Sequence, residues 1–149
     1  MSQYTAQIEK VKRNFLPEDF TVTTWDALQP YFENLKSREL DTPEALMKWM
    51  ADISELEAVI GEDACWRQIK MTCDTTDEKL EEAFTYFCME IEPKMKPYFF
   101  ELNQKLLASP FVKDLDDSTY YPYLRSVRNA VNLYREENVQ LHAEVSVLA

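Results

Sequence analysis

The chain contains a single glycine, Gly61, among its 149 residues. Strand-rich folds need glycine at hairpin turns and bulges, because glycine adopts backbone conformations that other residues avoid. Helical bundles can turn with Asn, Asp, Ser and Pro instead. The near absence of glycine therefore predicts an all-α fold.

Composition supports one well-packed domain and argues against a nucleic-acid partner. Apolar residues make up 46% of the chain, and a domain of this size buries about 68–70% of the surface that its unfolded chain exposes. The net charge is −11, from 16 Lys and Arg against 27 Asp and Glu. Because affinity for phosphate backbones depends on clustered basic side chains, we expect no binding to nucleic acid.

The expected location is the cytoplasm, with no membrane partner. The first fifteen residues, MSQYTAQIEKVKRNF, lack the continuous apolar run of a signal peptide. No segment approaches the 18 or more apolar residues of a transmembrane helix. The cysteine count is odd, at three, and a domain of this size does not need disulfides, so free reduced thiols are expected.

An irregular arm is expected over residues 1–22. It has a possible short helix at Tyr4–Lys12, and its contacts with the rest of the chain are expected to come from Phe15, Leu16 and Phe20. Residues 23–149 then form one helical domain. We expect this domain to be an antiparallel up-and-down bundle of about five to six helices.

Capping signals mark the first two helices of this bundle. Thr23 and Asp26 form a capping-box pattern, and Pro30 should kink or restart the helix that follows. The second helix begins at Asp41-Thr42-Pro43-Glu44, which combines an N-cap residue, a proline and an acid. Behind it, seven apolar residues keep the 3.6-residue period and predict a core face: Leu46, Trp49, Met50, Ile53, Leu56, Val59 and Ile60.

Gly61 is expected to break or cap that helix, so that a separate one begins at Glu62. Thr75 and Glu78 form another capping box. The stripe behind it is expected to be buried: Leu80, Ala83, Phe84, Phe87, Cys88 and Ile91.

The remaining helical pattern runs to the end of the chain. Pro93 and Pro97 should kink the helix that continues from this stripe to Ser109-Pro110. The last strong helix is predicted from about Ser118 to Glu137, with Asn138 as its C′ residue. A further helical pattern, VQLHAEVSVLA, stops without a cap, so we expect the chain to be the front part of a longer protein.

Four side chains have the chemistry of a zinc site: Cys65, Cys73, Cys88 and His142. Their spacing argues against zinc, because structural sites use tight pairs such as CxxC or HxxxH and this chain has none. Packed thiols are the favoured interpretation, and Cys88 lies within the predicted core stripe. The stretch ACWRQIKMTCDTTDEKL is accordingly interpreted as a helix end and a helix start, with Trp66 and Cys73 buried.

Other catalytic and metal motifs find little support. A catalytic cysteine would need His142 brought next to a thiol by the fold. A di-iron bundle site needs two ExxH motifs, and the residue three before His142 is Val139. The acidic loop at residues 74–78, DTTDE, lacks the glycine and the carboxylate spacing of an EF-hand, so it is interpreted as a helix cap. We therefore predict no catalytic, cofactor-binding or metal-ligating residue.

A ligand-binding surface made of aromatic and arginine side chains is an alternative interpretation that the sequence does not exclude. Aromatics at helical spacing are usually core residues, although they can form a ligand surface; the candidates are Trp25, Trp49, Trp66, Tyr120, Tyr121 and Tyr123. Arg67, Arg125 and Arg128 can pair with carboxylates or grip a peptide terminus. Structural ion pairs are the favoured interpretation for these arginines.

Five blocks of the chain carry a resemblance to a known family. In order, they are FLPEDFTVTTWDALQPYFENL, SELEAVIGEDACWRQIKMTCDTTDEKL, IEPKMKPY, LASPF and YLRSVRNAVNLYREENVQL. Their succession closely resembles the N-terminal region of bacterial oligoendopeptidase F-like enzymes, in the M3 family of zinc metallopeptidases. The resemblance covers nearly all of the chain from Phe15 onward, and no block is a catalytic motif.

The resemblance implies a helical N-terminal lobe that faces the C-terminal catalytic lobe of the same polypeptide across a channel for oligopeptide substrates. In that family, two histidines of an HExxH helix and a downstream glutamate hold zinc, and the motif's own glutamate activates water. This sequence has one histidine, and His142 is followed by Ala143 and Glu144. Zinc is thus implied for the full-length parent, whereas this chain alone should be inactive.

Two alternatives stay open from sequence. One is a free-standing, non-enzymatic helical module that shares ancestry with the lobe and docks a protein partner on an exposed apolar face. The other is an enzyme that uses His142 together with a cysteine.

Overall fold

The computed structural model describes residues 11–148, which form six α-helices, a π-helical turn and a 3₁₀ turn without a strand. This confirms the predicted all-α fold. The elements in chain order are α1 (Trp25–Ser37), α2 (Pro43–Cys73), α3 (Glu78–Tyr86), η1 (Phe87–Ile91), α4 (Glu92–Ala108), η2 (Pro110–Asp114), α5 (Asp117–Leu133) and α6 (Asn138–Leu148).

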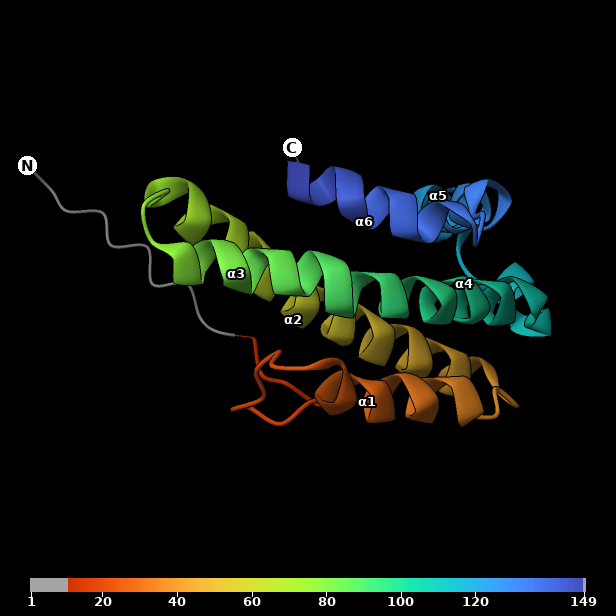
Figure 1. Cartoon of the computed structure of the whole chain (residues 1–149). Helices are drawn as coiled ribbons and strands as arrows, with labels where there is room; N and C mark the ends of the chain where they lie inside the picture. Colours follow the sequence, from red (N-terminus) through yellow and green to blue (C-terminus); the bar gives the residue numbers. More distant parts are fainter. Residues whose placement is uncertain (1–10, 149) are drawn as a thin grey trace, which may run out of the picture.

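The elements α3, η1 and α4 follow one another without a break and form a long rod through the middle of the molecule (Figure 1). Helices α1 and α2 pack along one side of this rod, and α6 packs on its other side, against η1 and α4. Helix α5 contacts α4 and is seen nearly end-on in the same view. The bundle is therefore up-and-down except at α5, which crosses it.

Helix starts follow the local capping chemistry, with two changes from the predicted cap residues. The N-cap of α1 is Thr24 rather than Thr23, since the Thr24 hydroxyl accepts from the Ala27 N–H. Thr42 caps α2 as predicted. The cap of α3 is Asp77 rather than Thr75, because the Asp77 carboxylate accepts from the Lys79 N–H at 3.0 Å.

The prediction that Gly61 ends a helix was wrong, because α2 continues through it to Cys73. Gly61 is exposed, and a methyl group placed on it would meet no atom within 4 Å. A helical glycine costs only about 1 kcal/mol relative to alanine. Packing on both sides of Gly61 outweighs that cost, with Ile60 buried before it and Arg67 bonded to the carbonyls of Val22 and Ala83 after it.

Pro93 and Pro97 do not interrupt the rod. Directly before Pro93 the chain forms the π turn η1, in which the Glu92 N–H bonds to the carbonyl of Phe87, five residues back. This shift in hydrogen-bond pattern lets the chain enter α4 with Pro93 in its first turn, where no intrahelical N–H is required. Pro97 lies inside α4.

The C-terminal helices also differ from their predicted limits. Helix α5 begins at Asp117 and ends at Leu133, four residues earlier than predicted. Asn138 is the first residue of α6 rather than a C′ residue. Ser109 caps the end of α4 as predicted, and the following segment forms the turn η2.

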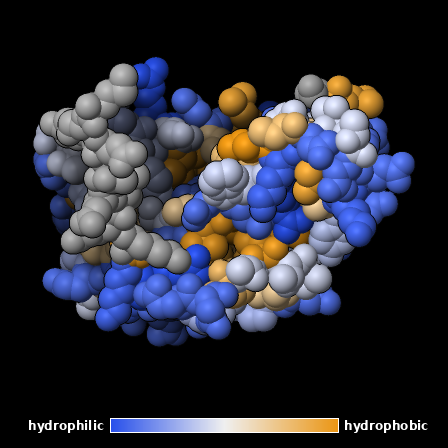
Figure 2. Space-filling view, turned by 90° about the vertical axis from the view of Figure 1, so that its left-hand side faces the viewer, coloured by the Kyte–Doolittle hydropathy of each residue, from blue (hydrophilic) through white to orange (hydrophobic). Residues whose placement is uncertain are grey.

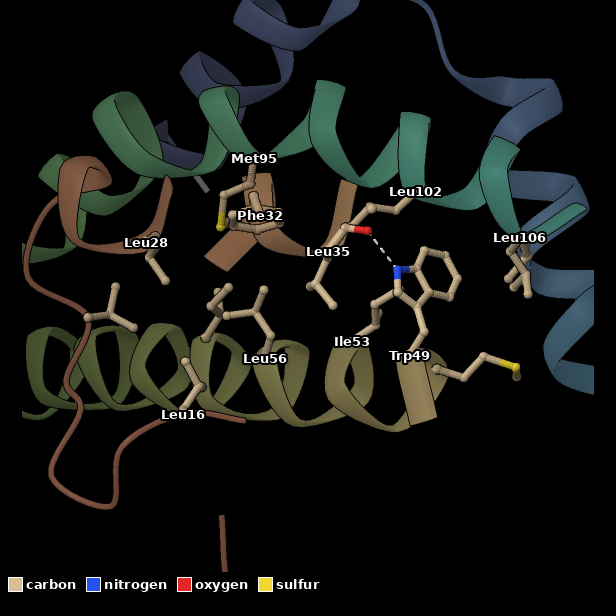
Figure 3. Close-up of a cluster of buried hydrophobic side chains, with 14 of the residues drawn as sticks. Leu16, Leu28, Phe32, Leu35, Trp49, Ile53, Leu56, Met95, Leu102 and Leu106 are labelled. Atoms are coloured by element: carbon tan, nitrogen blue, oxygen red, sulfur yellow. Dashed lines mark hydrogen bonds between the residues drawn. The ribbon is translucent and has the colours of Figure 1, made fainter. Parts of the chain in front are cut away.

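The core lies between α1, α2 and the rod (Figure 3). Trp49 is the largest side chain in it, only 1% exposed, and its indole N–H donates to the carbonyl oxygen of Leu35 at 2.8 Å. The predicted core face of α2 is confirmed, since six of its seven residues are buried and Val59 is half-buried. Other members come from α1 and α4: Leu28, Phe32, Leu35, Met95, Leu102 and Leu106.

Lys105 of α4 closes the C-terminal end of α1. Its ammonium donates to the carbonyl oxygens of Lys36, at 2.7 Å, and of Leu35 and Arg38. The last carbonyls of a helix have no partner within the helix, so a cation placed there satisfies them. Burial, followed by the charge of Arg38, lowers the pKa of Lys105, so its ammonium is desolvated where it makes these bonds.

The N-terminal arm packs on the bundle through the three predicted residues. Leu16 is buried, and the rings of Phe15 and Phe20 meet the ring of Tyr31 edge-on. Most of the predicted helix at Tyr4–Lys12 lies outside the described residues, and the described positions 11 and 12 are not helical. The domain limit between residues 22 and 23 stays a prediction.

Candidate functional site

The candidate side chains for zinc or thiol chemistry lie on different elements. Cys65 and Cys73 are exposed on α2, Cys88 is buried in η1, and His142 is exposed on α6, where its Nδ1 lies 4.0 Å from the Glu92 carboxylate. Among residues 11–148, no three His, Cys, Asp or Glu side chains are placed to hold a metal. Burial, then the negative charge of Glu92, raises the pKa of Cys88, which keeps this thiol protonated and weakly nucleophilic.

The acidic loop after α2 forms local hydrogen bonds with its own residues. Asp74 accepts from the hydroxyl and the backbone N–H of Thr76, and these bonds lower the pKa of Asp74. Asp77 caps α3. Asp77 therefore acts as a helix cap, as predicted for this loop, and Asp74 stabilises the turn before it.

Trp66 and Cys73 were predicted to be buried, and this was wrong. Trp66 is 53% exposed, and Cys73 is exposed as well. The reason is that α2 does not break at Gly61, so the register set by Leu46 to Ile60 continues and Trp66 falls outside the buried face.

The three arginines divide into one structural residue and two exposed ones. Arg67 binds Asp63 at 2.6 Å and donates to the carbonyls of Val22 and Ala83, so it connects α2, the arm and α3. Arg125 and Arg128 are exposed on α5, and neither forms an ion pair within residues 11–148. The structural interpretation is thus confirmed for Arg67.

Glu55 holds the N-terminal arm, a role that local sequence patterns did not indicate. Its carboxylate accepts three backbone N–H groups, from Asn14, Phe15 and Leu16, at 2.7–3.0 Å. Burial alone would raise the pKa of Glu55, but these hydrogen bonds outweigh it and the pKa is lowered. The charged carboxylate is therefore the form that fixes the arm on α2.

Replacement of Glu55 by glutamine is expected to lower the free energy of unfolding by about 1–2 kcal/mol, because one charge-assisted acceptor for the arm is lost. A lowered carboxyl pKa stabilises the fold above the unfolded pKa, and that stabilisation is lost as pH falls toward the folded value. The deficit of E55Q should therefore shrink between about pH 5 and pH 3 in urea titrations. E62Q, which changes an exposed glutamate on the same helix, is the control. An equal loss of unfolding free energy in E62Q, or a loss in E55Q that does not change with pH, would contradict this role.

A groove lies between the first half of α2 and the start of α5. It has a volume of about 350 Å³, and the residues that line it are Met47, Met50, Ala51, Ser54, Glu57, Thr119, Tyr120 and Tyr123. Burial raises the pKa of Glu57, while burial and then the charge of Glu57 raise the pKa of Tyr123 to about 12. Two acidic groups with raised pKa values thus share one apolar groove.

Helix α6 carries apolar residues on both its inner and its outer side. Ala143 is buried and Val147 packs on the core, whereas Leu141, Val145 and Leu148 are exposed. On the face shown in Figure 2, apolar residues line the floor of a central hollow and appear again at the upper right, beside the end of α6. Helix α6 therefore leaves several apolar side chains in contact with solvent.

None of the described helices is both long and apolar enough to span a bilayer.

Fold and surfaces together define an all-α domain that has a groove between α2 and α5 and a helix, α6, with apolar side chains on its outer side. Residues 15–134 match the family model for the Peptidase M3 N-terminal domain. The chain therefore belongs to the family of M3 peptidase N-terminal domains, which confirms the predicted family resemblance. No curated protein and no solved structure matches it significantly.

The family match ends at the boundary between two helices, α5 and α6. It ends at residue 134, which caps the end of α5, so α6 lies outside the matched domain. Helix α6, which exposes Leu141, Val145 and Leu148, is therefore the element that follows the family domain in the chain.

Proposed function

We propose that this chain is the N-terminal helical lobe of an oligoendopeptidase F-like zinc metallopeptidase that cleaves short peptides in the cytoplasm. The observation that carries the proposal is the family match over residues 15–134. The all-α bundle formed by the described residues agrees with such a role.

The residues of this chain do not fit the zinc site of the proposed parent. An HExxH site needs two histidines on one helix turn and a further glutamate, and the chain has one histidine. We propose that the zinc and the water-activating glutamate belong to the C-terminal catalytic lobe. No step of peptide hydrolysis is assigned to a residue of this chain.

The catalytic lobe is the proposed partner of the apolar residues on α6. Leu141, Val145 and Leu148 are exposed on an element that lies outside the matched domain. Contact with a second lobe would remove these side chains from water, and burial of apolar area is the main favourable term in such contacts. The runner-up function is a non-enzymatic interaction module that uses the same surface for a separate protein.

An activity assay on the purified 149-residue chain tests the absence of a catalytic site. We expect no cleavage of a fluorogenic oligopeptide above background, with or without added zinc, because the ligand set is incomplete. Hydrolysis that 1,10-phenanthroline abolishes and zinc restores would contradict the proposal. Thermolysin with the same substrate serves as the positive control.

A further inference from the structure

The groove between α2 and α5 combines apolar walls with one carboxylate, that of Glu57. Met47 and Met50 form part of its α2 side, and Tyr120 and Tyr123 form part of its α5 side. Between them, the small side chains of Ala51 and Ser54 leave the groove open. Such a lining accommodates an alkyl chain, since methionine side chains adapt to the shape of the group they contact.

Glu57 supplies the charge of this groove, and its side chain is exposed to solvent. Within residues 11–148 it forms no ion pair and no hydrogen bond, and the described lining residues include no Lys, Arg or His. Its titratable neighbours in the groove are Tyr120 and Tyr123, and the phenol of Tyr123 carries no charge at about pH 7 because its pKa lies well above that value. An exposed carboxylate at the edge of an apolar groove, with no ion-pair partner among the described residues, gains most from a ligand that brings a positive charge.

The tyrosines favour the same kind of ligand. A Lys ammonium or an Arg guanidinium is attracted to the face of an aromatic ring, and more strongly where water is partly excluded. Tyr120 is half-buried and Tyr123 is 37% exposed, so both rings border the groove while remaining reachable from solvent. A carboxylate, two phenol rings and two thioether chains together match the stem and the charged head of a basic side chain.

We propose that the α2–α5 groove binds a Lys or Arg side chain of a short peptide, with the charged head at Glu57 and the aliphatic stem against Met47 and Met50. The choice of a peptide as the carrier of this side chain rests on the proposed peptidase function. The groove would then give the full-length enzyme a preference for peptides with a basic residue.

The methionine methyl groups give a direct test on the 149-residue chain. We expect the ¹³C-methyl signals of Met47 and Met50 to shift on addition of acetyl-Leu-Lys-Leu-amide, with a Kd on the order of 1 mM, as suits a short flexible ligand. The signals of Met71, Met89 and Met95, which do not line the groove, should stay in place. Acetyl-Leu-norleucine-Leu-amide, which keeps an alkyl stem and lacks the charge, should bind about tenfold more weakly.

Two variants separate the groove from the general acidity of the chain. E57Q should weaken binding of the lysine peptide about tenfold and leave that of the norleucine peptide unchanged. E82Q removes an acid that lies outside the groove, and it should change neither. Circular dichroism spectra of both variants should match the wild type.

Three outcomes would overturn the proposal. These are unshifted Met47 and Met50 signals at about 10 mM peptide, roughly ten times the expected Kd, equal affinity for the two peptides, or equal weakening in E57Q and E82Q. Because binding is measured directly on this chain, such a failure leaves the peptidase proposal standing. Conversely, selective binding together with a reading frame that stops at Ala149 would support the groove and contradict the peptidase proposal.

Discussion

Replacement of Trp49 by alanine is expected to lower the free energy of unfolding by about 4 kcal/mol. The side chain is 1% exposed and lies between α1, α2 and α4, so truncation removes the largest buried apolar group and leaves a cavity. It also removes the indole N–H that bonds to the Leu35 carbonyl at the end of α1. Urea denaturation followed by circular dichroism measures the loss.

A graded series divides this effect between packing and hydrogen bonding. W49F keeps an aromatic ring but loses the indole donor. It should therefore lower the free energy of unfolding by about 1–2 kcal/mol relative to the wild type. W66A is the matched control, because Trp66 lies on the same helix and is 53% exposed. W66A should change stability by about 0.5 kcal/mol or less, and a loss equal to that of W49A would contradict the assigned core.

Replacement of Lys105 by methionine is expected to destabilise the fold by about 2–3 kcal/mol. Methionine keeps most of the aliphatic stem, but the ammonium that satisfies the carbonyls of Leu35, Lys36 and Arg38 is lost. Hydrogen bonds to charged groups contribute about 1.5–3 kcal/mol, and unsatisfied carbonyls at a half-buried helix end add a desolvation cost. Urea titration again gives the change, with K113M at an exposed lysine as the control.

Trp49 and Lys105 share an acceptor, so their effects should not add. Both donate to the carbonyl of Leu35. In a double-mutant cycle of W49F and K105M, we expect an interaction free energy of at least about 0.5 kcal/mol. If the two losses of unfolding free energy simply add, the indole and the ammonium bind the end of α1 independently, which would contradict this prediction.

Local sequence patterns were sufficient for much of the bundle. The Thr42-Pro43 start and the apolar period of α2 predicted both its first residue and its core face, because these signals act within one or two turns. The same reasoning placed Thr23 and Thr75 one and two residues away from the actual caps, Thr24 and Asp77. Threonines and aspartates close together offer competing caps, and only the three-dimensional contacts select among them.

The error at Gly61 explains a second error at Trp66. A glycine weakens a helix by only about 1 kcal/mol, which contacts from Arg67 to residues 16 and 45 positions away can offset. Once α2 is continuous, the core face set before Gly61 fixes which later residues point inward, and Trp66 is not among them. A prediction that assumes a helix break at Gly61 cannot use the core-facing positions before Gly61 to decide which later side chains are buried.

The site residues that sequence reasoning missed act over long distances in the chain. Glu55 bonds to residues about 40 positions earlier, and Lys105 bonds to residues about 70 positions earlier. The groove likewise joins α2 to α5, so no local motif could reveal Glu57 beside Tyr123.

The proposed role of this helical domain, as the N-terminal lobe of a longer M3-type zinc peptidase, depends on what the gene encodes after Ala149. Determining the coding sequence beyond that residue is therefore the decisive measurement. We predict an open reading frame that continues into a second lobe with an HExxH motif and a downstream glutamate. A stop codon directly after Ala149 would contradict this role, and would leave the non-enzymatic interaction module as the function of this fold.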